Sequence, residues 1–309
     1  MSDALKNRTR EYGLFGFDRE VIPPPAFPET LPDIVIGKPI VAGDMLDAVE
    51  KFPGTLQKNG YPLAKVQDVQ YTLEPEKKEL NCDIVVDVGP CTNFGDVRVT
   101  GNKEVSSDFF KDALPWKVGE TPWNSDDLED FANELRQSGL FRSVEAKPAK
   151  DAIKQGNDGI AVLPVDIAVK EGLFHTIGAN AHYDTSTGFG IEGMWEHRNL
   201  FHHGERLTVT APIATNEQGL KFAFEKPHFY NRDQKLTAQG SALHEKTEAY
   251  ESTSVSLSSN VERRLTKYLW GGLGVFFEGG TIEDSEHSAQ SFSAYGRQAF
   301  LRHDSRDNA

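Results

Sequence analysis

The chain has 309 residues, a formal net charge of -14 and a pI of about 5.1. This length suggests two or three domains, and the acidic balance argues against a protein that binds the phosphate backbone of nucleic acids. Mean hydropathy is -0.49, and no run reaches the ~18–20 apolar residues that a membrane helix requires. Helical membrane proteins are therefore excluded. A transmembrane β-barrel stays open, because only alternate residues of its strands face lipid.

The N-terminal segment, residues 1–33, is predicted to be irregular. It contains Pro23-Pro24-Pro25 and further prolines at 28 and 32. This composition is typical of a linker or of the remnant of something larger. The first ten residues lack the apolar core of a secretory signal. We therefore expect either a cytoplasmic chain or one whose true beginning lies upstream.

Residues 34–91 predict a small domain with one helix and two strands. Apolar residues spaced for one helix face lead to a helix stop at Asn59-Gly60. Strand-like segments at 66–73 and 84–88 follow, separated by a charged turn at 74–78. The predicted helix face consists of Met45, Leu46, Val49, Phe52 and Leu56.

Residues 92–172 predict a second α+β unit. A strand at 94–100 is followed by a helix near 106–114 and by a second helix that begins at about Ser125. We assign Ser125 as the N-cap of that second helix, because a serine side chain can accept a hydrogen bond from a free amide of the first turn. The remaining strands are expected at residues 141–147 and 160–170.

The two units share a sequence pattern at an offset of 79 residues. Leu56-Gln-Lys-Asn-Gly60 aligns with Leu135-Arg-Gln-Ser-Gly139, and Val86-Asp87-Val88 aligns with Val165-Asp166-Ile167. We interpret this as an internal repeat. The alternative is that any two small α+β domains would share the same order of elements.

The two cysteines, Cys82 and Cys91, are too few for a disulfide framework. If the strand between them is continuous, the two cysteines lie ~30 Å apart at ~3.3 Å per residue, too far for a bridge. A disulfide would require the chain to double back at Gly89-Pro90. Their redox state stays open at this stage.

The segment from residue 173 onward is predicted to contain strands only. After the block Gly193–Leu207, apolar residues at 207, 209, 211 and 213 alternate with polar residues at 206, 208 and 210, which gives a strand with one apolar and one polar face. Short turns such as 186–188 and longer polar loops such as 279–290 suit an outer-membrane barrel, and they also suit a soluble β-sandwich. The eight predicted strands are 175–184, 189–197, 205–213, 220–226, 235–246, 249–263, 268–278 and 291–302.

Histidines and glycines do not form an enzymatic pattern in this sequence. His202 and His203 are adjacent, so within a strand they would point to opposite faces and could not both bind one ion. His182 and Asp184 share a strand face, but no third ligand follows nearby. The stretch 271–274 (Gly-Gly-Leu-Gly) lacks the following helix that a phosphate-binding loop requires, so we interpret it as strand glycine that faces a barrel interior or large neighbours.

No Gly-x-Ser-x-Gly motif and no cysteine beside a histidine occur in the sequence. We therefore predict a protein without catalytic residues, bound metal or cofactor. Trp195, Trp270 and Tyr268 are expected either at a membrane interface or in a core.

Four stretches together resemble the BamA/TamA superfamily of outer-membrane assembly proteins. Residues 135–144 resemble the end of a POTRA helix that enters its second strand, and Gly89-Pro90 before 94–97 resembles the junction of two POTRA domains. Residues 195–207 resemble the second barrel strand, its turn and the third strand, and residues 225–229 resemble the end of the fourth. The resemblance extends over roughly residues 40–309 and looks closest to TamA, whose members carry three POTRA domains.

The resemblance implies α+β POTRA domains followed by an antiparallel transmembrane β-barrel, of which this chain supplies the N-terminal half. The implied domains are 34–91 (POTRA-like), 92–172 (POTRA) and 173–309 (half-barrel), after the irregular segment 1–33. Family members carry a signal sequence, an earlier POTRA domain and about sixteen strands, against about eight here. The family's Arg-Gly-containing motif on an inward loop late in the barrel is also absent. We therefore expect a fragment of a longer protein.

The resemblance further implies a non-enzymatic assembly factor in the outer membrane of a Gram-negative bacterium, with the POTRA domains in the periplasm. Its partners would be client outer-membrane proteins, autotransporters among them, membrane lipid, and an inner-membrane-anchored TamB-like protein bound through the POTRA domains. Clients would enter by strand addition at a weakly paired first strand. That gate strand comprises His175, Thr176, Ile177, Gly178, Ala179, Asn180, Ala181, His182 and Tyr183. The family motif comprises Trp195, Glu196, His197, Arg198, Asn199, Leu200, Phe201, Gly204 and Glu205.

Two alternatives compete with this interpretation. One, within the same fold, is a two-partner-type pore that secretes a polypeptide. The other, from another class, is a soluble all-β binding module or carbohydrate-active enzyme with α+β appendages.

Overall fold

The computed structural model describes residues 31–35, 37–77, 79–156, 160–185, 188–266, 268–284, 288–303 and 305. Most of the predicted irregular segment 1–33 and the predicted turn residues 186–187 lie outside this range. The chain divides into two compact units. One comprises residues 1–94, 118–126 and 150–163, and the other comprises 95–117, 127–149 and 164–309.

The first unit contains the predicted helix and hairpin. Helix α1 (Ala42–Lys58) buries the face predicted from its spacing, except that Leu46 is exposed. Strands β1 (Lys65–Glu74) and β2 (Glu79–Asp87) pair antiparallel as a two-stranded sheet. The core of this unit is formed by Phe52, Leu56 and Ala64, with Leu31, Tyr61, Val86 and Val88 packed against it.

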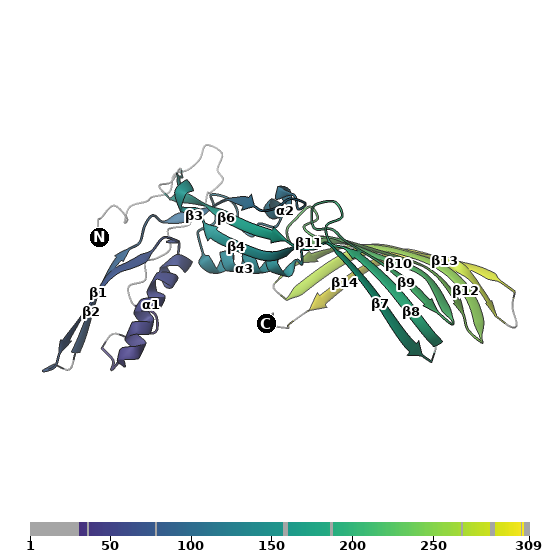
Figure 1. Ribbon diagram of the computed structural model, residues 1–309, viewed down its shortest axis with the longest axis horizontal. Coiled ribbons are helices and arrows are strands. Elements are labelled where there is room, and N and C mark those ends of the chain that lie inside the picture. The colour runs from purple at the N-terminus through teal and green to yellow at the C-terminus, as the bar shows by residue number, and fades with distance from the viewer. Residues whose placement is uncertain are drawn as a thin grey trace. The chain divides into compact units, whose positions relative to one another are not determined.

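The next elements follow the predicted order of the second α+β unit (Figure 1). They are β3 (Thr92–Thr100), α2 (Ser107–Asp112), α3 (Ser125–Gln137), β4 (Phe141–Pro148), β5 (Lys154–Gln155) and β6 (Ala161–Glu171), and the sheet order is β3-β6-β4 with β5 on β6. The prediction of Ser125 as an N-cap is wrong. The side-chain oxygen of Asn124 accepts the Asp126 amide at 2.8 Å, so Asn124 takes that role and Ser125 is the first helical residue.

The ends of the two long helices support the predicted repeat. Gly60 follows α1 with φ +90°, and Gly139 follows α3 with φ +74°. These values lie in the left-handed region that glycine adopts without a Cβ penalty, so each glycine ends its helix and turns the chain toward a strand. The two aligned Gly positions therefore have the same structural role.

The remaining strands form one antiparallel sheet of eight, in sequence order (Figure 1). The prediction of a polar loop over 279–290 is wrong for residues 279–284. These residues continue strand β13 to Asp284, because they pair antiparallel with residues 250–255 of the preceding strand. The strands are β7 (His175–Asp184), β8 (Gly188–His197), β9 (Arg206–Ala214), β10 (Glu217–Lys226), β11 (Gln234–Lys246), β12 (Tyr250–Arg264), β13 (Leu269–Asp284) and β14 (Gln290–His303).

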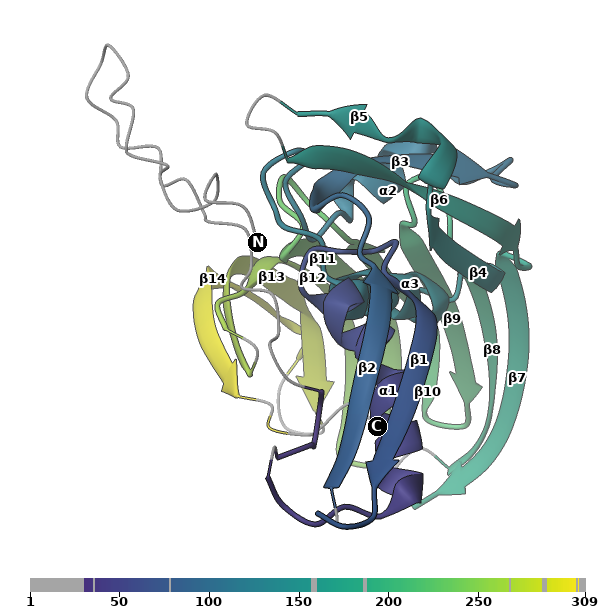
Figure 2. The same cartoon turned by 90° about the vertical axis from the view of Figure 1, so that its left-hand side faces the viewer.

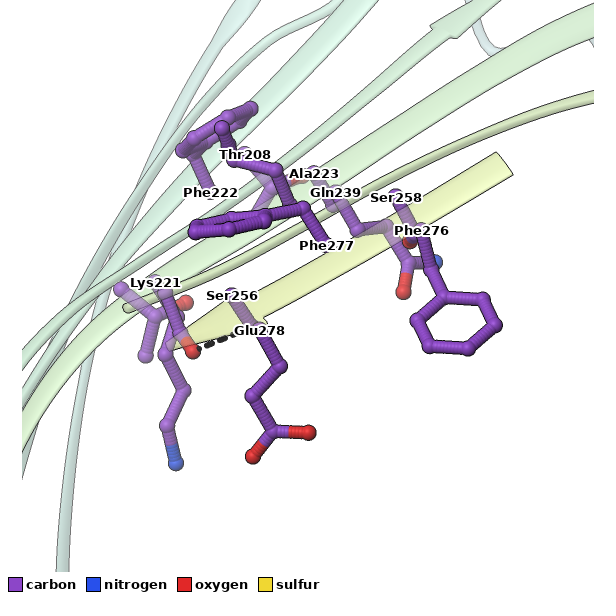
Figure 3. Close-up of a pocket in the computed structure, with 14 residues that line it drawn as sticks. Thr208, Lys221, Phe222, Ala223, Gln239, Ser256, Ser258, Phe276, Phe277 and Glu278 are labelled. Carbon is purple, nitrogen blue, oxygen red and sulfur yellow. Dashed lines mark hydrogen bonds between the residues drawn. The ribbon is translucent and has the colours of Figure 1, made fainter. Parts of the chain in front are cut away.

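The register divides this sheet into an apolar and a polar face. One row of partners across all eight strands is Ile177, Trp195, Val209, Phe222, Gly240, Leu257, Phe277 and Tyr295. The adjacent row, on the other face, is Gly178, Met194, Thr210, Lys221, Ser241, Ser256, Glu278 and Ala294. Figure 3 shows Lys221 and Glu278 on one side of these strands and Phe222 on the other.

Among the described residues, no other part of this unit covers the apolar face. Ile177 is 83% exposed and Tyr295 is also 83% exposed. An uncovered apolar face opposite a polar one is the pattern of a membrane-barrel wall. Separately, none of the described helices is long and apolar enough to cross a bilayer.

Replacing Gly101 by alanine should destabilise the α+β unit by about 2 kcal/mol or more. Gly101 has φ +89°, and an added Cβ would lie 2.0 Å from the carbonyl oxygen of Val169, which is backbone and cannot move aside. Gly54→Ala is the matched control. A Cβ there meets nothing within 4 Å inside helix α1, so we expect a gain of about 0.5–1 kcal/mol. Urea unfolding followed by tryptophan fluorescence compares the two, and equal stability of both variants would contradict the assignment.

Candidate functional site

The predicted gate strand lies at an edge of the eight-stranded sheet. Among the described strands β7 pairs with β8 alone, and β14 forms the opposite edge. Figure 2 shows β7 and β14 at the two ends of the sheet. No described strand pairs with the other side of β7.

The backbone geometry identifies which residues of β7 face the open edge. Arg198 donates its amide to the Phe174 carbonyl at 2.9 Å, so the pair 174 and 198 is hydrogen-bonded and every second pair after it is as well. The Thr215 amide donates to the Phe189 carbonyl at 3.0 Å. The backbone groups of odd-numbered β8 residues therefore bond to β9, which leaves the even-numbered ones to bond to β7. The open-edge residues, whose N–H and C=O groups point away from β8, are therefore His175, Ile177, Ala179, Ala181 and Tyr183.

The side chains of β7 contribute little packing. Gly178, Ala179 and Ala181 are small, and Ile177 and Tyr183 are largely exposed. Small residues bury little area against their cross-strand partners, so the pairing of β7 depends mainly on backbone hydrogen bonds. Its role as a gate stays a prediction.

The predicted family motif forms the end of β8 and a buried turn before β9. Asn199 is 2% exposed and the Glu205 side chain is 1% exposed. The Glu205 carboxylate accepts the amides of Phe201 (3.3 Å) and His203 (3.0 Å) and pairs with Lys226 Nζ at 2.9 Å. One carboxylate thereby closes the turn on itself and links it to β10.

The protonation of Glu205 follows from these partners. Burial by itself would raise the pKa of this carboxyl group. Hydrogen bonds from Lys226 and from the backbone amides, together with the charge of Lys226, outweigh burial and hold the pKa below its ordinary value. Glu205 is therefore ionised over the range in which the protein would function.

The same turn packs against residues 104–109, which belong to the same compact unit as the sheet. The Asn199 side-chain amide and His202 Nδ1 both donate to the Glu104 carbonyl, at 2.9 and 2.7 Å. The Ser106 amide donates back to the His202 carbonyl at 2.7 Å. Gly204 has φ +75°, and a Cβ there would lie 2.8 Å from the Phe109 ring, so only glycine allows this close approach.

A second turn docks beside the first. Arg232 Nε donates to the Ala113 carbonyl at 2.9 Å, and its guanidinium also pairs with the Glu134 carboxylate. The His228 ring lies 5.6 Å from the Phe109 ring in an edge arrangement. Sequence reasoning missed Arg232 and Glu134, which are 98 residues apart, because no local pattern relates them.

Arg198 connects the docked unit with the edge strand. Its Nη1 donates to the Gly139 carbonyl at 3.5 Å, its Nε pairs with Glu196 at 2.7 Å, and its Nη2 donates to the Thr176 hydroxyl of β7. The planar guanidinium can hold three acceptors in fixed directions. Arg198 therefore links Gly139, just after the end of α3, to Thr176 of β7.

The other motif residues pack around these contacts. His175 lies 4.4 Å from His197 and 5.8 Å from Trp195 between ring centroids, and Phe201 lies 6.4 Å from Phe224. The Leu200 amide donates to the Glu205 carbonyl at 3.1 Å.

Other residues singled out in the sequence have structural environments. His203 Nδ1 donates to the Phe201 carbonyl at 3.0 Å. A Cβ on Gly272 would lie 2.3 Å from the Phe300 ring, so the prediction that these strand glycines face large neighbours is confirmed. In the described ranges, no group of three His, Cys, Asp or Glu side chains is placed to hold a metal ion.

Cys82 and Cys91 are both free thiols. Burial raises the pKa of each thiol, and the neighbouring Asp83 raises that of Cys82 further. A raised pKa leaves less thiolate at a given pH than an ordinary cysteine would have.

Comparisons with known proteins support a POTRA domain and a barrel fold. Residues 92–172 match the family described as POTRA: Surface antigen variable number repeat. The structure is similar to BamA from Haemophilus ducreyi lacking POTRA domains 1-3, with a TM-score of 0.66 and 14% identity over 87% of this chain. CdiB from Acinetobacter baumannii is matched less well, with a TM-score of 0.48 and 13% identity over 86% of this chain and 52% of that one. Haemophilus influenzae BamA POTRA3-5 gives a TM-score of 0.34 and 23% identity over 45% of this chain and 52% of that one. A search of curated proteins gave no match.

Residues 92–172 thus match a POTRA domain, and the chain has the fold of BamA, with an open antiparallel sheet that matches the BamA barrel. The resemblance identified in the sequence and the predicted fold class are confirmed at this level, and the narrower likeness to TamA stays a prediction. The chain spans about half the length of the BamA chain it matches, 54%.

The Glu205→Gln variant should be less stable than the wild type by about 2–3 kcal/mol, because an NH₂ donor replaces the oxygen that Lys226 binds and the ammonium loses its charged partner. A carboxyl whose folded pKa is depressed stabilises the fold above its unfolded pKa of about 4.3 and loses that contribution as the pH falls through the folded value. The difference between variant and wild type should therefore shrink in acid. Urea unfolding in detergent micelles between pH 7 and 3 measures it. Glu217→Gln, which breaks a more exposed ion pair with Lys221, is the control and should cost less than about 1 kcal/mol.

The Arg198→Ala variant should loosen β7 without unfolding the sheet. Losing the bonds to Thr176 and Gly139 should speed hydrogen exchange at β7 amides about tenfold, equivalent to about 1.4 kcal/mol. Arg206→Ala, at the start of β9, is the control and should leave β7 exchange unchanged. Unchanged exchange in Arg198→Ala would show that Arg198 does not hold the edge strand.

Proposed function

We propose that the protein is a non-enzymatic outer-membrane assembly factor that helps other β-barrel proteins, autotransporters among them, to insert. The observations that carry this proposal are the likeness of the sheet to the BamA barrel and the small side chains of β7, the first strand of that sheet. In this proposal residues 173–309 form part of a membrane wall, and residues 34–91 and 92–172 lie in the periplasm of a Gram-negative bacterium.

The proposed reaction is the addition of a client strand to β7. An incoming extended segment would exchange backbone hydrogen bonds with His175, Ile177, Ala179, Ala181 and Tyr183. Unsatisfied backbone groups cost several kcal/mol each in lipid, so a membrane environment favours pairing strongly. Because these five residues share the apolar face, a client with apolar residues opposite them would extend the same lipid-facing surface.

The docked turns supply the proposed route from the periplasmic unit to the edge strand. Arg198 touches both Gly139 and Thr176, so a movement at the end of α3 would change the support of β7. We further propose client outer-membrane proteins, membrane lipid and a TamB-like inner-membrane partner as binding partners, and neither nucleic acid nor a cofactor.

A two-partner-type secretion pore is the second candidate. It is supported by the hollow on the polar face, where Lys221, Ser256 and Glu278 would line an aqueous lumen (Figure 3). A soluble β-module fits less well, since an uncovered apolar face across eight strands is rare in soluble proteins. Depletion in the native host distinguishes the first two, because an assembly factor lowers the level of many barrels and a pore lowers one secreted polypeptide.

Proline substitutions along β7 test strand addition. The Ala179 amide points to the open edge, so Ala179→Pro removes one outward donor and leaves the β7–β8 bonds intact. The Asn180 amide faces β8, so Asn180→Pro should destabilise the protein itself. Ala179→Val keeps the donor and is the matched control.

The variants are introduced into the gene in the native host, and the levels of the protein and of other outer-membrane barrels are measured. We expect Ala179→Pro to keep a normal level of the protein while client barrels fall several-fold, and Ala179→Val to resemble the wild type. Normal client levels in Ala179→Pro would refute strand addition at this edge.

A further inference from the structure

An apolar groove lies on the apolar face of the sheet, over β12, β13 and β14, close to where β12 ends. Gly271 forms its floor, and Leu265 and Leu301 rise on either side of it. A Cβ at Gly271 would lie 3.1 Å from Leu265 and 3.4 Å from Leu301, so both side chains border the space that the glycine leaves. The groove continues over Leu273 and Ala299, and Leu273 and Leu301 are about 70% exposed (69% and 73%).

One arginine stands at the end of this groove. Arg263 is the register partner of Gly271, and Gly271 is the partner of Leu301. The Arg263 side chain therefore lies on the same face as Leu301 and lines the groove. Within the described part of the chain, no carboxylate pairs with the exposed Arg263 guanidinium. Its neighbours differ, because Arg264 and Arg302 belong to the polar face, where Asp233 holds the first and the Trp270 ring lies 5.5 Å from the second.

The groove opens at the end of the sheet that carries the POTRA contacts. The Arg264 amide donates to the Asp233 carbonyl at 2.8 Å, and the adjacent Arg232 holds the Ala113 carbonyl of the POTRA unit. The carboxylates of Glu251 and Glu283 form a register pair on the same face at the opposite end of β12 and β13. At that far end Lys246 of β11 pairs with Glu251 at 2.6 Å, so the charges there are partly compensated, whereas Arg263 at the POTRA end has no carboxylate partner among the described residues.

From this charge and shape complementarity we infer that the groove binds one phospholipid of the leaflet nearest the POTRA domain. Its phosphate pairs with Arg263, and one acyl chain lies over Gly271, Leu273 and Ala299. A guanidinium binds phosphate oxygens through two parallel hydrogen bonds, and the groove beside it shields an acyl chain from water. The inference rests on the membrane location in the proposed function. A free phosphate or a bare acyl chain would satisfy only half of the site.

The test uses the full chain in mild detergent and titrates dioleoylphosphatidylglycerol, with bound lipid counted by native mass spectrometry. Dioleoylglycerol has the same chains without phosphate, and glycerol phosphate has the phosphate without chains. We expect the phospholipid to bind at least about tenfold more tightly than either, as expected when both a charge-assisted hydrogen bond and apolar burial contribute. Equal binding of dioleoylglycerol or of glycerol phosphate would overturn the inference.

Variants with matched controls locate the site. Arg263→Gln and Gly271→Leu should each weaken phospholipid binding about tenfold, the first by removing the charge and the second by filling the floor. Arg302→Gln is at the same end on the polar face, and Gly193→Leu makes the same change on the apolar face where a Cβ meets nothing within 4 Å. Both controls should bind like the wild type. Wild-type binding by Arg263→Gln, or equal losses in the controls, would refute the site.

Failure of the lipid site and failure of the proposed function give different results. Alkaline extraction of membranes from the native host tests membrane integration without reference to Arg263. A protein that stays in the washed membranes but binds lipid equally in all variants refutes the groove alone. A protein released by alkali refutes the membrane wall, and with it the inference.

Discussion

The ionised Glu205 carboxylate is the interaction on which much of the second unit depends. It accepts two backbone amides within its own turn and one ammonium from β10, so a single side chain sets the turn between β8 and β9 and its distance from the next hairpin. Burying a carboxylate is favourable only when its oxygens are this well satisfied. The closed turn then presents Asn199, His202 and Gly204 toward the POTRA unit.

The docked turns give the sheet and the POTRA unit a shared set of polar contacts. Asn199 of the first turn donates to the Glu104 carbonyl, and Arg232 of the second pairs with the Glu134 carboxylate. The Phe109 ring contacts both turns, at Gly204 and at His228. Interfaces that combine satisfied hydrogen bonds with a small apolar centre hold a fixed geometry better than apolar contact alone. Such a geometry would let Arg198 sense the end of α3 and support β7 at the same time.

The two-faced sheet explains how an acidic chain of low mean hydropathy can suit a membrane. Its apolar residues are concentrated on one face by the alternation of strand side chains, while serines, Lys221 and Glu278 occupy the other. The same alternation places the open-edge backbone groups of β7 on residues of the apolar face. In the proposed function, strand addition and lipid contact would therefore involve the same five residues.

Much of this architecture follows from the sequence by itself. Eight strands, the helices of both α+β units and the apolar–polar alternation are local properties, because they depend on the two-residue period of a strand and the 3.6-residue period of a helix. The repeated glycines at 60 and 139 were identifiable for the same reason, since a helix end needs a left-handed residue close to it in sequence. The motif at 195–205 could also be recognised, because its turn is built from neighbouring residues.

Other features were decided only by the tertiary structure. The role of Asn124 as the cap and the extension of β13 to Asp284 depend on which partner each backbone group meets. The outward phase of β7, the contact of Arg232 with Glu134 and the isolation of Arg263 beside Gly271 depend on strand register and on packing between distant segments. These relations join residues far apart in the chain, and no local period encodes them.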